Sequence, residues 1–388
     1  MIQKPHLLAG LSAPDRRGSD SNKWSRYGSD VLPLWVADMD FSAAPEISDA
    51  VAARLAHGVL GYGRPWPGLA EAIAKALHAD YDWEVDPDWL IFTPGVEPAL
   101  NMALRASTQP GDAMVVELPN YKALTSAAAH NKLELRAIWQ SLGDDGRWHA
   151  DRAAFAQAAE GAKAMLLCNP HNPTGRVLTR DELSFRADLC LKHGLTLISD
   201  EIHCGLTLDG RKHIPIASLS PEIAAQSVTL MAASKTWNIA GLKASFAVIP
   251  NADLRNAVQN AKGGLVDSTN VLGLAATEAA YAKGNAWRAL VRQQLEINRD
   301  HLTQLLAAHL PQARMVPAEA SFLAWIDFSD LALPLPAAEF FLKNAAVALS
   351  CGTEFAPGLT SWARLNFGCE PDLLDAAVLR MAEAVAQV

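Results

Sequence analysis

Short apolar segments recur along the middle of this chain, and helical patterns separate them. The stretch from Arg180 to His193, between two of these segments, has the length and pattern of a helix. Near-continuous apolar strands that alternate with helices are typical of a mostly parallel sheet with helices on both faces. We therefore predict an α/β fold of this type. The segments comprise residues 113–116, 164–168, 196–199, 228–231 and 246–249.

The pattern changes near residue 286. A long amphipathic helix is predicted from Trp287 to His309, and a short strand follows at 322–326. A Gly-rich connection at 351–358 then precedes a last strand at 362–367. This succession indicates a second, smaller α+β domain, and a chain of 388 residues is long enough for two domains. We predict a large domain of residues 49–285 and a small domain formed by residues 1–48 and 286–388.

Charge and hydropathy exclude several classes of partner. The formal net charge is −9, which gives no general attraction to nucleic acid or anionic lipid. No apolar run approaches the roughly 20 residues that cross a bilayer. The N-terminal residues also lack the apolar core of a signal peptide. We expect no nucleic-acid partner, no membrane partner and a cytoplasmic location.

The sequence lacks the signatures of a disulfide scaffold, a zinc ribbon and a dinucleotide-binding site. The five cysteines are scattered and form no Cys-x-x-Cys pair, which argues against a disulfide scaffold and a zinc ribbon. We expect reduced thiols and no bound metal. No strand-to-helix junction carries Gly-x-Gly-x-x-Gly, which counts against a dinucleotide-binding enzyme.

Polar residues follow two of the predicted strands. The loop Asn169–Gly175 follows one strand, and Asp200 follows the next. Ligands of such sheets bind beyond the carboxyl ends of the strands, and the Asn172 amide could contact a carboxylate or ring oxygen there. Asp200 and Glu201 point to opposite faces of an extended segment, so only one is expected to meet the ligand. A loop-capping asparagine and a buried structural aspartate are the ordinary alternatives.

Two further stretches suggest a site for a phosphorylated aldehyde. Gly95 stands between the strand-like segment 89–93 and an Ala/Leu-rich helix, where free backbone N–H groups could bind an anion. Lys235 follows an apolar run and small residues. Burial lowers the pKa of a lysine, so that its free amine can attack an aldehyde. Taken alone, each stretch has an ordinary alternative, a turn glycine and a surface lysine.

Four motifs occur in order along nearly the whole chain. Together they resemble the fold type I pyridoxal-phosphate enzymes of the class I/II aminotransferase superfamily. The motifs are Asn-Pro-His-Asn-Pro-Thr-Gly (169–175), Ser-Asp-Glu-Ile-His (199–203), Ser-Lys-Thr-Trp-Asn (234–238) and Arg-Leu-Asn-Phe (364–367).

Shorter segments narrow the resemblance to one subgroup. They look like the MalY/PatB subgroup, whose usual activity is that of a carbon–sulfur β-lyase of the cystathionine β-lyase type. The segments are Trp35–Phe41, His57–Val59, Gly61–Gly63, Thr93–Val96 and Asp200–His203.

The resemblance implies pyridoxal 5′-phosphate as the cofactor. Lys235 is then the lysine that forms the Schiff base and removes the substrate Cα proton. Asp200 is expected to face the pyridine nitrogen and keep it protonated, because a nearby carboxylate favours the charged form. Asn172 and His203 are expected near the ring hydroxyl, and Tyr121 is expected to stack on the ring.

The resemblance also implies a phosphate site. Gly95 and Val96 are expected to bind the phosphate, with Ser234 assisting. Lys243 stands where many relatives have an arginine, and it should supply charge without paired hydrogen bonds. Tyr62 is expected to reach the phosphate of the neighbouring subunit in a homodimer.

A small amino-acid substrate follows from the same resemblance. Arg364 is expected to bind its α-carboxylate through paired charge-assisted hydrogen bonds, and Trp35 and Asn172 are expected to line the substrate pocket. Two positions depart from the subgroup pattern. Gly205 stands where lyases often carry an acid, and Glu97 adds a negative charge near the expected phosphate site, for which the sequence offers no reason.

Three functions follow from these residues. The leading hypothesis is β-elimination from a cysteine S-conjugate such as cystathionine, which gives a thiol, pyruvate and ammonia. An aminotransferase acting on an L-amino acid is the first alternative, since it needs the same lysine, aspartate and arginine. The second is a pyridoxal-phosphate-binding regulatory protein with a partner-binding role. The intact set of Lys235, Asp200, Asn172 and Arg364 argues against a degenerate site.

Overall fold

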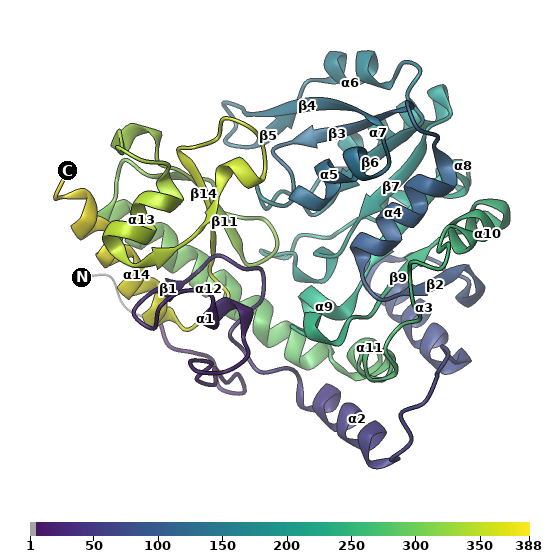
Figure 1. Ribbon diagram of the computed structural model, residues 1–388, viewed down its shortest axis with the longest axis horizontal. Coiled ribbons are helices and arrows are strands. Elements are labelled where there is room, and N and C mark those ends of the chain that lie inside the picture. Colours follow the sequence, from purple (N-terminus) through teal and green to yellow (C-terminus); the bar gives the residue numbers. More distant parts are fainter. Residues whose placement is uncertain (1–4) are drawn as a thin grey trace.

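An eight-stranded sheet forms the centre of the larger lobe in the computed structural model, which describes residues 5–388 (Figure 1). The strand order is β2-β9-β8-β7-β6-β3-β4-β5. The strands β8, β7, β6, β3 and β4 run parallel, while β9 is antiparallel to both neighbours and β5 is antiparallel to β4. The predicted α/β fold with a mostly parallel sheet is confirmed. The strands are β2 (Leu90–Thr93), β3 (Ala113–Leu118), β4 (Glu134–Leu142), β5 (Trp148–Ala150), β6 (Ala164–Cys168), β7 (Thr196–Asp200), β8 (Ser227–Met231) and β9 (Ser245–Val248).

Helices cover both faces of this sheet. Side chains alternate along β3, so Met114 and Val116 belong to one apolar cluster and Ala113 and Val115 to another. Because both faces are covered, every residue of β3 is buried, which explains its apolar run at residues 113–116. The first cluster contains α4 (Val96–Ser107), α5 (Lys122–His130) and α10 (Ala252–Asn260), and the second contains α6 (Arg152–Ala159), α7 (Arg180–His193) and α8 (Pro221–Ala225).

Local signals set the ends of α7, which has the predicted bounds. Thr179 accepts a hydrogen bond from the backbone N–H of Glu182, and the Glu182 carboxylate accepts one from the backbone N–H of Thr179. At the other end Gly194 adopts a left-handed conformation with φ of 65°, which a glycine tolerates without strain.

A second lobe contains a four-stranded antiparallel sheet in the order β10-β11-β14-β13. Figure 1 shows this sheet beside the long helix α12, which confirms the helix predicted from Trp287 to His309. The second lobe consists of β10 (Arg314–Met315), β11 (Leu323–Asp327), β13 (Ser350–Cys351), β14 (Trp362–Asn366), α12 (Asn285–His309), α13 (Ala337–Ala345) and α14 (Pro371–Val385).

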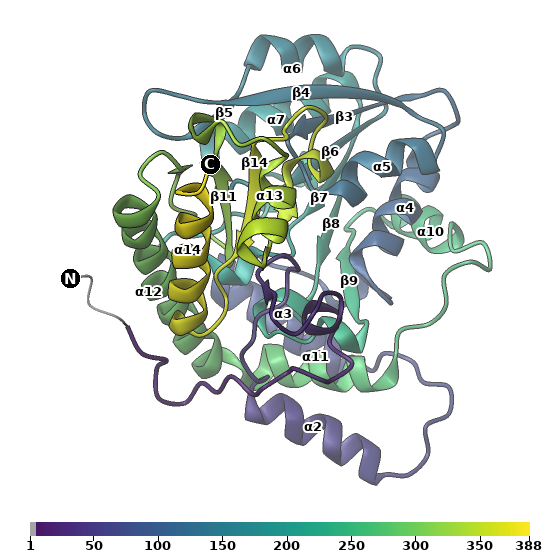
Figure 2. The same cartoon turned by 60° about the vertical axis from the view of Figure 1, so that its left-hand side comes forward.

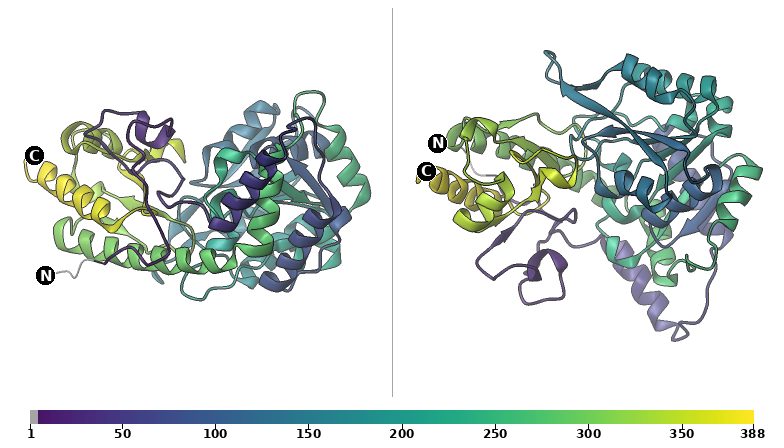
Figure 3. Two further views of the ribbon diagram at one scale, coloured as in Figure 1. Left: turned by 90° about the horizontal axis from the view of Figure 1, so that it is seen from below. Right: turned by 45° about the horizontal axis from the view of Figure 1, so that its top comes forward.

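The N-terminal segment joins both lobes. Its strand β1 (Leu32–Pro33) pairs in parallel with β12 (Val347–Ala348), which lies just before β13. Figure 3 shows this purple segment beside the smaller lobe before it crosses to the larger one. The domain boundaries predicted at residues 48 and 285 stay a prediction, and residues 1–4 of the first segment lie outside the described residues.

Three helices form one edge of the larger lobe. Figure 2 shows α2 lying along α11, and α3 also packs against α11.

None of the helices in residues 5–388 is long and apolar enough to cross a membrane. The remaining helices are α1 (Asn22–Ser25), α2 (Pro45–Ala56), α3 (Pro67–Tyr81), α9 (Ala233–Thr236) and α11 (Val271–Lys283).

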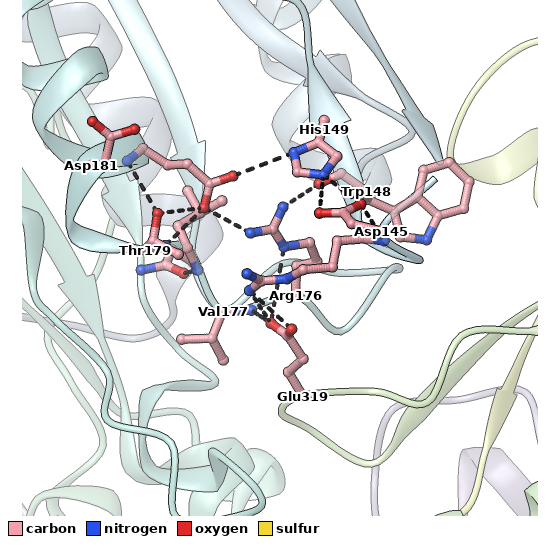
Figure 4. Close-up of polar contacts among 12 residues, drawn as sticks. Asp145, Trp148, His149, Arg176, Val177, Thr179, Asp181 and Glu319 are labelled. Carbon is pink, nitrogen blue, oxygen red and sulfur yellow. Dashed lines mark hydrogen bonds and ion pairs between the residues drawn. The ribbon is translucent and has the colours of Figure 1, made fainter. Parts of the chain in front are cut away.

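A polar network links the two lobes near Glu319, which precedes β11 (Figure 4). One Glu319 oxygen lies 3.0 Å from Arg147 Nη2, and the other accepts a hydrogen bond of 2.8 Å from the Val177 backbone N–H. The buried Arg176 lies 3.9 Å from the same carboxylate and pairs with Glu182 at 2.7 Å. Glu319 is therefore the shared partner of two segments of the chain, one at Arg147 and one at Arg176–Val177.

Replacement of Glu319 by alanine should destabilise the fold. The change leaves the Val177 N–H without its acceptor and removes one carboxylate from the buried Arg176. An unsatisfied buried donor costs about 1–3 kcal/mol, so we expect the free energy of unfolding to fall by about that amount. Urea denaturation measures it. Asp145→Ala is the control, because Asp145 is exposed in the same network, and an equal loss in both variants would contradict the assignment.

Candidate active site

A cavity of about 640 Å³ lies where β6, β7 and β8 end. These strands are parallel neighbours, so their carboxyl ends meet at one edge of the sheet. The structure brings all of the predicted site residues except Tyr62 to this cavity. Its lining includes Trp35, Gly95, Val96, Tyr121, Asn172, Asp200, His203, Ser234, Lys235, Lys243 and Arg364.

Lys235 lies in the short helix α9, just beyond the end of β8. Its Nζ donates a hydrogen bond of 2.7 Å to the carbonyl oxygen of Ala37. The surrounding protein shields the amine from water, and with the positive charge of Arg364 it lowers the pKa of Lys235 to about 8. A useful fraction of the amine is therefore unprotonated near neutral pH, as a nucleophile or base requires.

Asp200 is the last residue of β7 and lines the cavity. Burial raises its pKa to about 6, although the Ile202 N–H, 3.1 Å from Oδ1, and the charge of Lys235 act in the opposite direction. The next residue, Glu201, faces away and pairs with His213 at 2.6 Å. Of the two acids only Asp200 therefore lines the cavity, while Glu201 has a structural contact, and the expected contact of Asp200 with a ligand stays a prediction.

Arg364 is a buried cation on β14. Its Nη1 donates to Asn172 Oδ1 at 3.0 Å, and its Nη2 donates to the Trp35 carbonyl at 3.1 Å and to Ser350 Oγ at 3.2 Å. Burial lowers the pKa of Arg364 to about 10, so the guanidinium stays charged at neutral pH. Among residues 5–388 it forms no ion pair with a carboxylate, and its Nε has no hydrogen-bond partner. A charged, buried and unpaired guanidinium in a cavity is suited to an anionic ligand.

The residues at the start of α4 are those expected to bind the cofactor phosphate. Gly95 precedes the helix and Val96 begins it, and the first backbone N–H groups of a helix have no acceptor within the helix. Lys243 adds a positive charge to the same cavity, and Ser234 adds a hydroxyl. These donors suit the phosphate of pyridoxal phosphate.

The other polar groups suit the ring of that cofactor. Burial lowers the pKa of His203 to about 3, so its imidazole is neutral, and its buried Nδ1 has no partner within the described part of the chain. A neutral imidazole and the Asn172 amide can both hydrogen-bond a ring oxygen. Asp200 supplies a carboxylate for a ring nitrogen, and Lys235 supplies an amine for an aldehyde. The donor set therefore fits pyridoxal phosphate.

Glu97, for which the sequence offered no reason, has a defined contact. Its Oε1 accepts a hydrogen bond of 2.8 Å from the Tyr121 hydroxyl. Burial and the Glu97 carboxylate together raise the pKa of Tyr121 well above its usual range, so the phenol stays protonated. Glu97 and Tyr121 both line the cavity.

The sequence does not predict that backbone carbonyls of residues 35–37 take part in the site. Trp35 contributes its carbonyl to Arg364, and Ala37 contributes its carbonyl to Lys235. Two motif asparagines hold this segment, because Asn238 donates to the Met39 and Phe41 carbonyls and Asn366 donates to the Val36 and Asp38 carbonyls. The asparagines were visible in the motifs, but their acceptors are almost 200 or more residues away in the chain. Ser350 gave no signal at all.

Gly205 and Tyr62 are two other positions that were singled out in the sequence. At Gly205 an added Cβ would lie 2.5 Å from Thr236 Oγ1, so no larger residue fits without movement of Thr236. The absence of an acid at this position therefore follows from packing against α9. Tyr62 is fully exposed on the loop after α2 and does not line the cavity of its own chain. Its expected contact with a neighbouring subunit stays a prediction.

Comparison with known proteins gives the family. Residues 29–381 match the aminotransferase class I and II model. The chain is 39% identical to cystathionine β-lyase PatB of Bacillus subtilis, with 96% of this chain and 98% of PatB covered. The crystal structure of OvoB is similar with a TM-score of 0.92 and 41% identity over 96% of this chain and 98% of that one. Cystalysin from Treponema denticola, whose crystal structure contains pyridoxal 5′-phosphate, is similar with a TM-score of 0.93 and 29% identity over 97% and 98%.

These similarities extend over nearly the full length of each protein, so they cover both lobes and every motif that lines the cavity. The chain is a pyridoxal-phosphate-dependent enzyme of fold type I that belongs to the class I and II aminotransferase family and, within it, to the MalY/PatB cystathionine β-lyase subgroup.

Proposed function

We propose that the protein cleaves the Cβ–sulfur bond of cysteine S-conjugates such as cystathionine, with release of a thiol, pyruvate and ammonia. The observation that carries the proposal is the pairing of two groups in one cavity. Lys235 offers an amine with a lowered pKa, and Arg364 offers a buried guanidinium without a carboxylate partner among the described residues. An L-amino acid supplies the groups that match both. Membership of the cystathionine β-lyase subgroup favours the lyase over the aminotransferase.

The proposed roles follow from the chemistry of each side chain. Bound pyridoxal phosphate supplies an electron sink for the pair left on Cα when a proton departs. Lys235 Nζ holds the cofactor aldehyde and afterwards accepts the Cα proton. Asp200 interacts with the pyridine nitrogen, and Asn172 and His203 interact with the ring hydroxyl. Tyr121 covers one face of the ring.

Arg364 is proposed to orient the substrate. Both Nη2 hydrogens are taken by Trp35 and Ser350, so the donors left for the oxygens of the α-carboxylate are the unpartnered Nε–H and the second Nη1 hydrogen. The guanidinium is already held by Asn172, Trp35 and Ser350, so little side-chain entropy is lost on binding. A fixed carboxylate selects which Cα bond breaks, and proton loss is then favoured over decarboxylation.

We also propose a homodimer in which Tyr62 reaches the phosphate of the other subunit. Supporting this, Tyr62 lies in a loop that also exposes Val59 and Leu60, and such a concentration of exposed apolar side chains is typical of an interface. Lys243 is the basic side chain expected at the phosphate site of one chain. A further donor from the other subunit could therefore also bind the phosphate.

The lyase proposal predicts pyruvate and a free thiol from cystathionine without any added keto acid. Coupled reduction of pyruvate and a thiol-reactive dye measure the two products. Lys235→Ala is the inactive control, because it removes the amine that holds the cofactor and moves the proton. Amino transfer to an added keto acid without thiol release would instead support the aminotransferase, and no reaction of either kind would support a regulatory role.

Arg364→Ala should raise KM for the amino-acid substrate by about 30-fold or more. Loss of a buried, hydrogen-bonded charge pair costs about 2–5 kcal/mol, which corresponds to that factor. Arg364→Lys keeps the charge without the paired donors and should give an intermediate KM. Steady-state kinetics give the KM values, and cofactor absorbance checks the site. Loss of the cofactor absorbance in Arg364→Ala would assign Arg364 to the cofactor instead.

For the proposed dimer we expect a solution mass of about twice 41.6 kDa in sedimentation equilibrium. Tyr62→Phe should leave this mass unchanged and weaken pyridoxal-phosphate binding by about tenfold, because a hydrogen bond to a charged group contributes about 1.5–3 kcal/mol. Cofactor titration followed by absorbance measures the affinity. A monomeric mass, or unchanged affinity in the variant, would contradict the role of Tyr62.

A further inference from the structure

Glu97 is a charged group in the cavity to which the proposed reaction assigns no task. It is the second residue of α4, and an acid there also stabilises the helix dipole. Its side chain, however, is held at the cavity by the Tyr121 hydroxyl at 2.8 Å. Within residues 5–388 it forms no ion pair with a cation. The helix dipole accounts for an acid at this position but not for its fixed contact with Tyr121.

The proposed roles pair the other charges in the cavity. Arg364 binds the α-carboxylate, Lys243 faces the phosphate, and Asp200 faces the pyridine nitrogen. Two carboxylates then have no opposite charge assigned to them, those of Glu97 and Glu354.

These two carboxylates lie on the solvent side of the cavity. Glu97 and Glu354 are exposed, whereas Asp200 and Arg364 are buried. A substrate held at its carboxylate and Cα by the buried groups must extend its sulfur substituent toward the open side. The substituent therefore enters a region of negative potential, which favours positive over neutral or negative groups.

Independent observations show that the cavity is built to receive a ligand. Arg364 Nε and His203 Nδ1 are buried and have no partner in the described chain, and both residues line the cavity. The cavity volume of about 640 Å³ exceeds the needs of a few water molecules and lies within the range of small-ligand sites.

We propose that Glu97 is a specificity-determining residue that selects cysteine S-conjugates whose thiol fragment carries a protonated amine. Tyr121 fixes one carboxylate oxygen of Glu97, and the other oxygen pairs with the ammonium group of the substrate. The inference rests on the proposed lyase function, since it concerns the leaving group. A fixed carboxylate loses little conformational freedom on binding, which distinguishes it from an ordinary exposed glutamate.

Two substrates of nearly equal shape test the inference. S-(2-aminoethyl)-L-cysteine ends in an ammonium group where S-propyl-L-cysteine ends in a methyl group. We expect the wild-type kcat/KM to be about three- to tenfold higher for the charged substrate, the factor given by a solvent-accessible ion pair of about 1 kcal/mol. In Glu97→Gln the ratio should fall toward one. S-carboxymethyl-L-cysteine, with a negative group, should be the poorest of the three in the wild type and should improve in the variant.

Glu222→Gln is the matched control, because Glu222 is an exposed glutamate in the first turn of α8, outside the cavity. The control should keep the wild-type ratio. A wild-type ratio near one, or a ratio that Glu97→Gln leaves unchanged, would overturn the inference. A purely helix-stabilising role predicts that second result, together with a lower unfolding temperature.

Failure of the lyase proposal can be told apart from failure of this inference. Without lyase activity no pyruvate forms from any of the three compounds. Titration of the cofactor absorbance with S-(2-aminoethyl)-L-cysteine and S-propyl-L-cysteine then gives their dissociation constants. The same three- to tenfold preference, lost in Glu97→Gln, supports the inference, and equal constants overturn it.

Discussion

Lys235 and Arg364, two cations of the active site, bind carbonyl groups of the same backbone segment. Lys235 Nζ lies 2.7 Å from the Ala37 carbonyl, and Arg364 Nη2 lies 3.1 Å from the Trp35 carbonyl. Lys235 belongs to the larger lobe and Arg364 to the smaller one, so residues 35–37 link the two lobes at the cavity. Asn238 donates to the Met39 and Phe41 carbonyls, and Asn366 donates to the Val36 and Asp38 carbonyls. Each motif that carries one of these cations thus also carries an asparagine that holds the backbone next to the acceptor of that cation.

Burial acts differently on the charged groups that surround this segment. It lowers the pKa of Lys235 to about 8, near the pH at which the amine must react, and it lowers the pKa of Arg364 only to about 10, so the guanidinium stays charged. It raises the pKa of Asp200 to about 6, and a positive ring nitrogen beside it would favour the ionised carboxylate. The exclusion of water is therefore one physical cause that acts on all three groups. Lys235 becomes a nucleophile, Arg364 is a buried group that binds anions, and Asp200 is a partner for the ring. The exposed Glu97 lies on the open side of the cavity.

Much of the fold could be predicted because buried parallel strands require apolar residues on both faces. The strands β3, β6, β7, β8 and β9 all appear as short apolar runs, and α7 begins and ends at its sequence signals. The strands β4 and β5, at one end of the sheet, were not predicted, because β4 is mostly exposed and its sequence from Glu134 to Leu142 mixes charged, polar and apolar residues. A strand that faces solvent has no continuous apolar pattern, so its pairing depends on the neighbouring strands.

The sequence by itself determined the buried strands of the central sheet, the order of the motifs and the motif residues that line the cavity. Only the tertiary structure decided which groups those residues contact. The hydrogen bonds of Arg364, the Tyr121 contact of Glu97 and the close approach of Thr236 to Gly205 depend on segments that are separated in the chain. Local patterns report whether a residue is buried and in what conformation, since these depend on neighbours along the chain. Hydrogen-bond partners and free space are set by the packing of distant segments, which a single sequence does not encode in any short pattern.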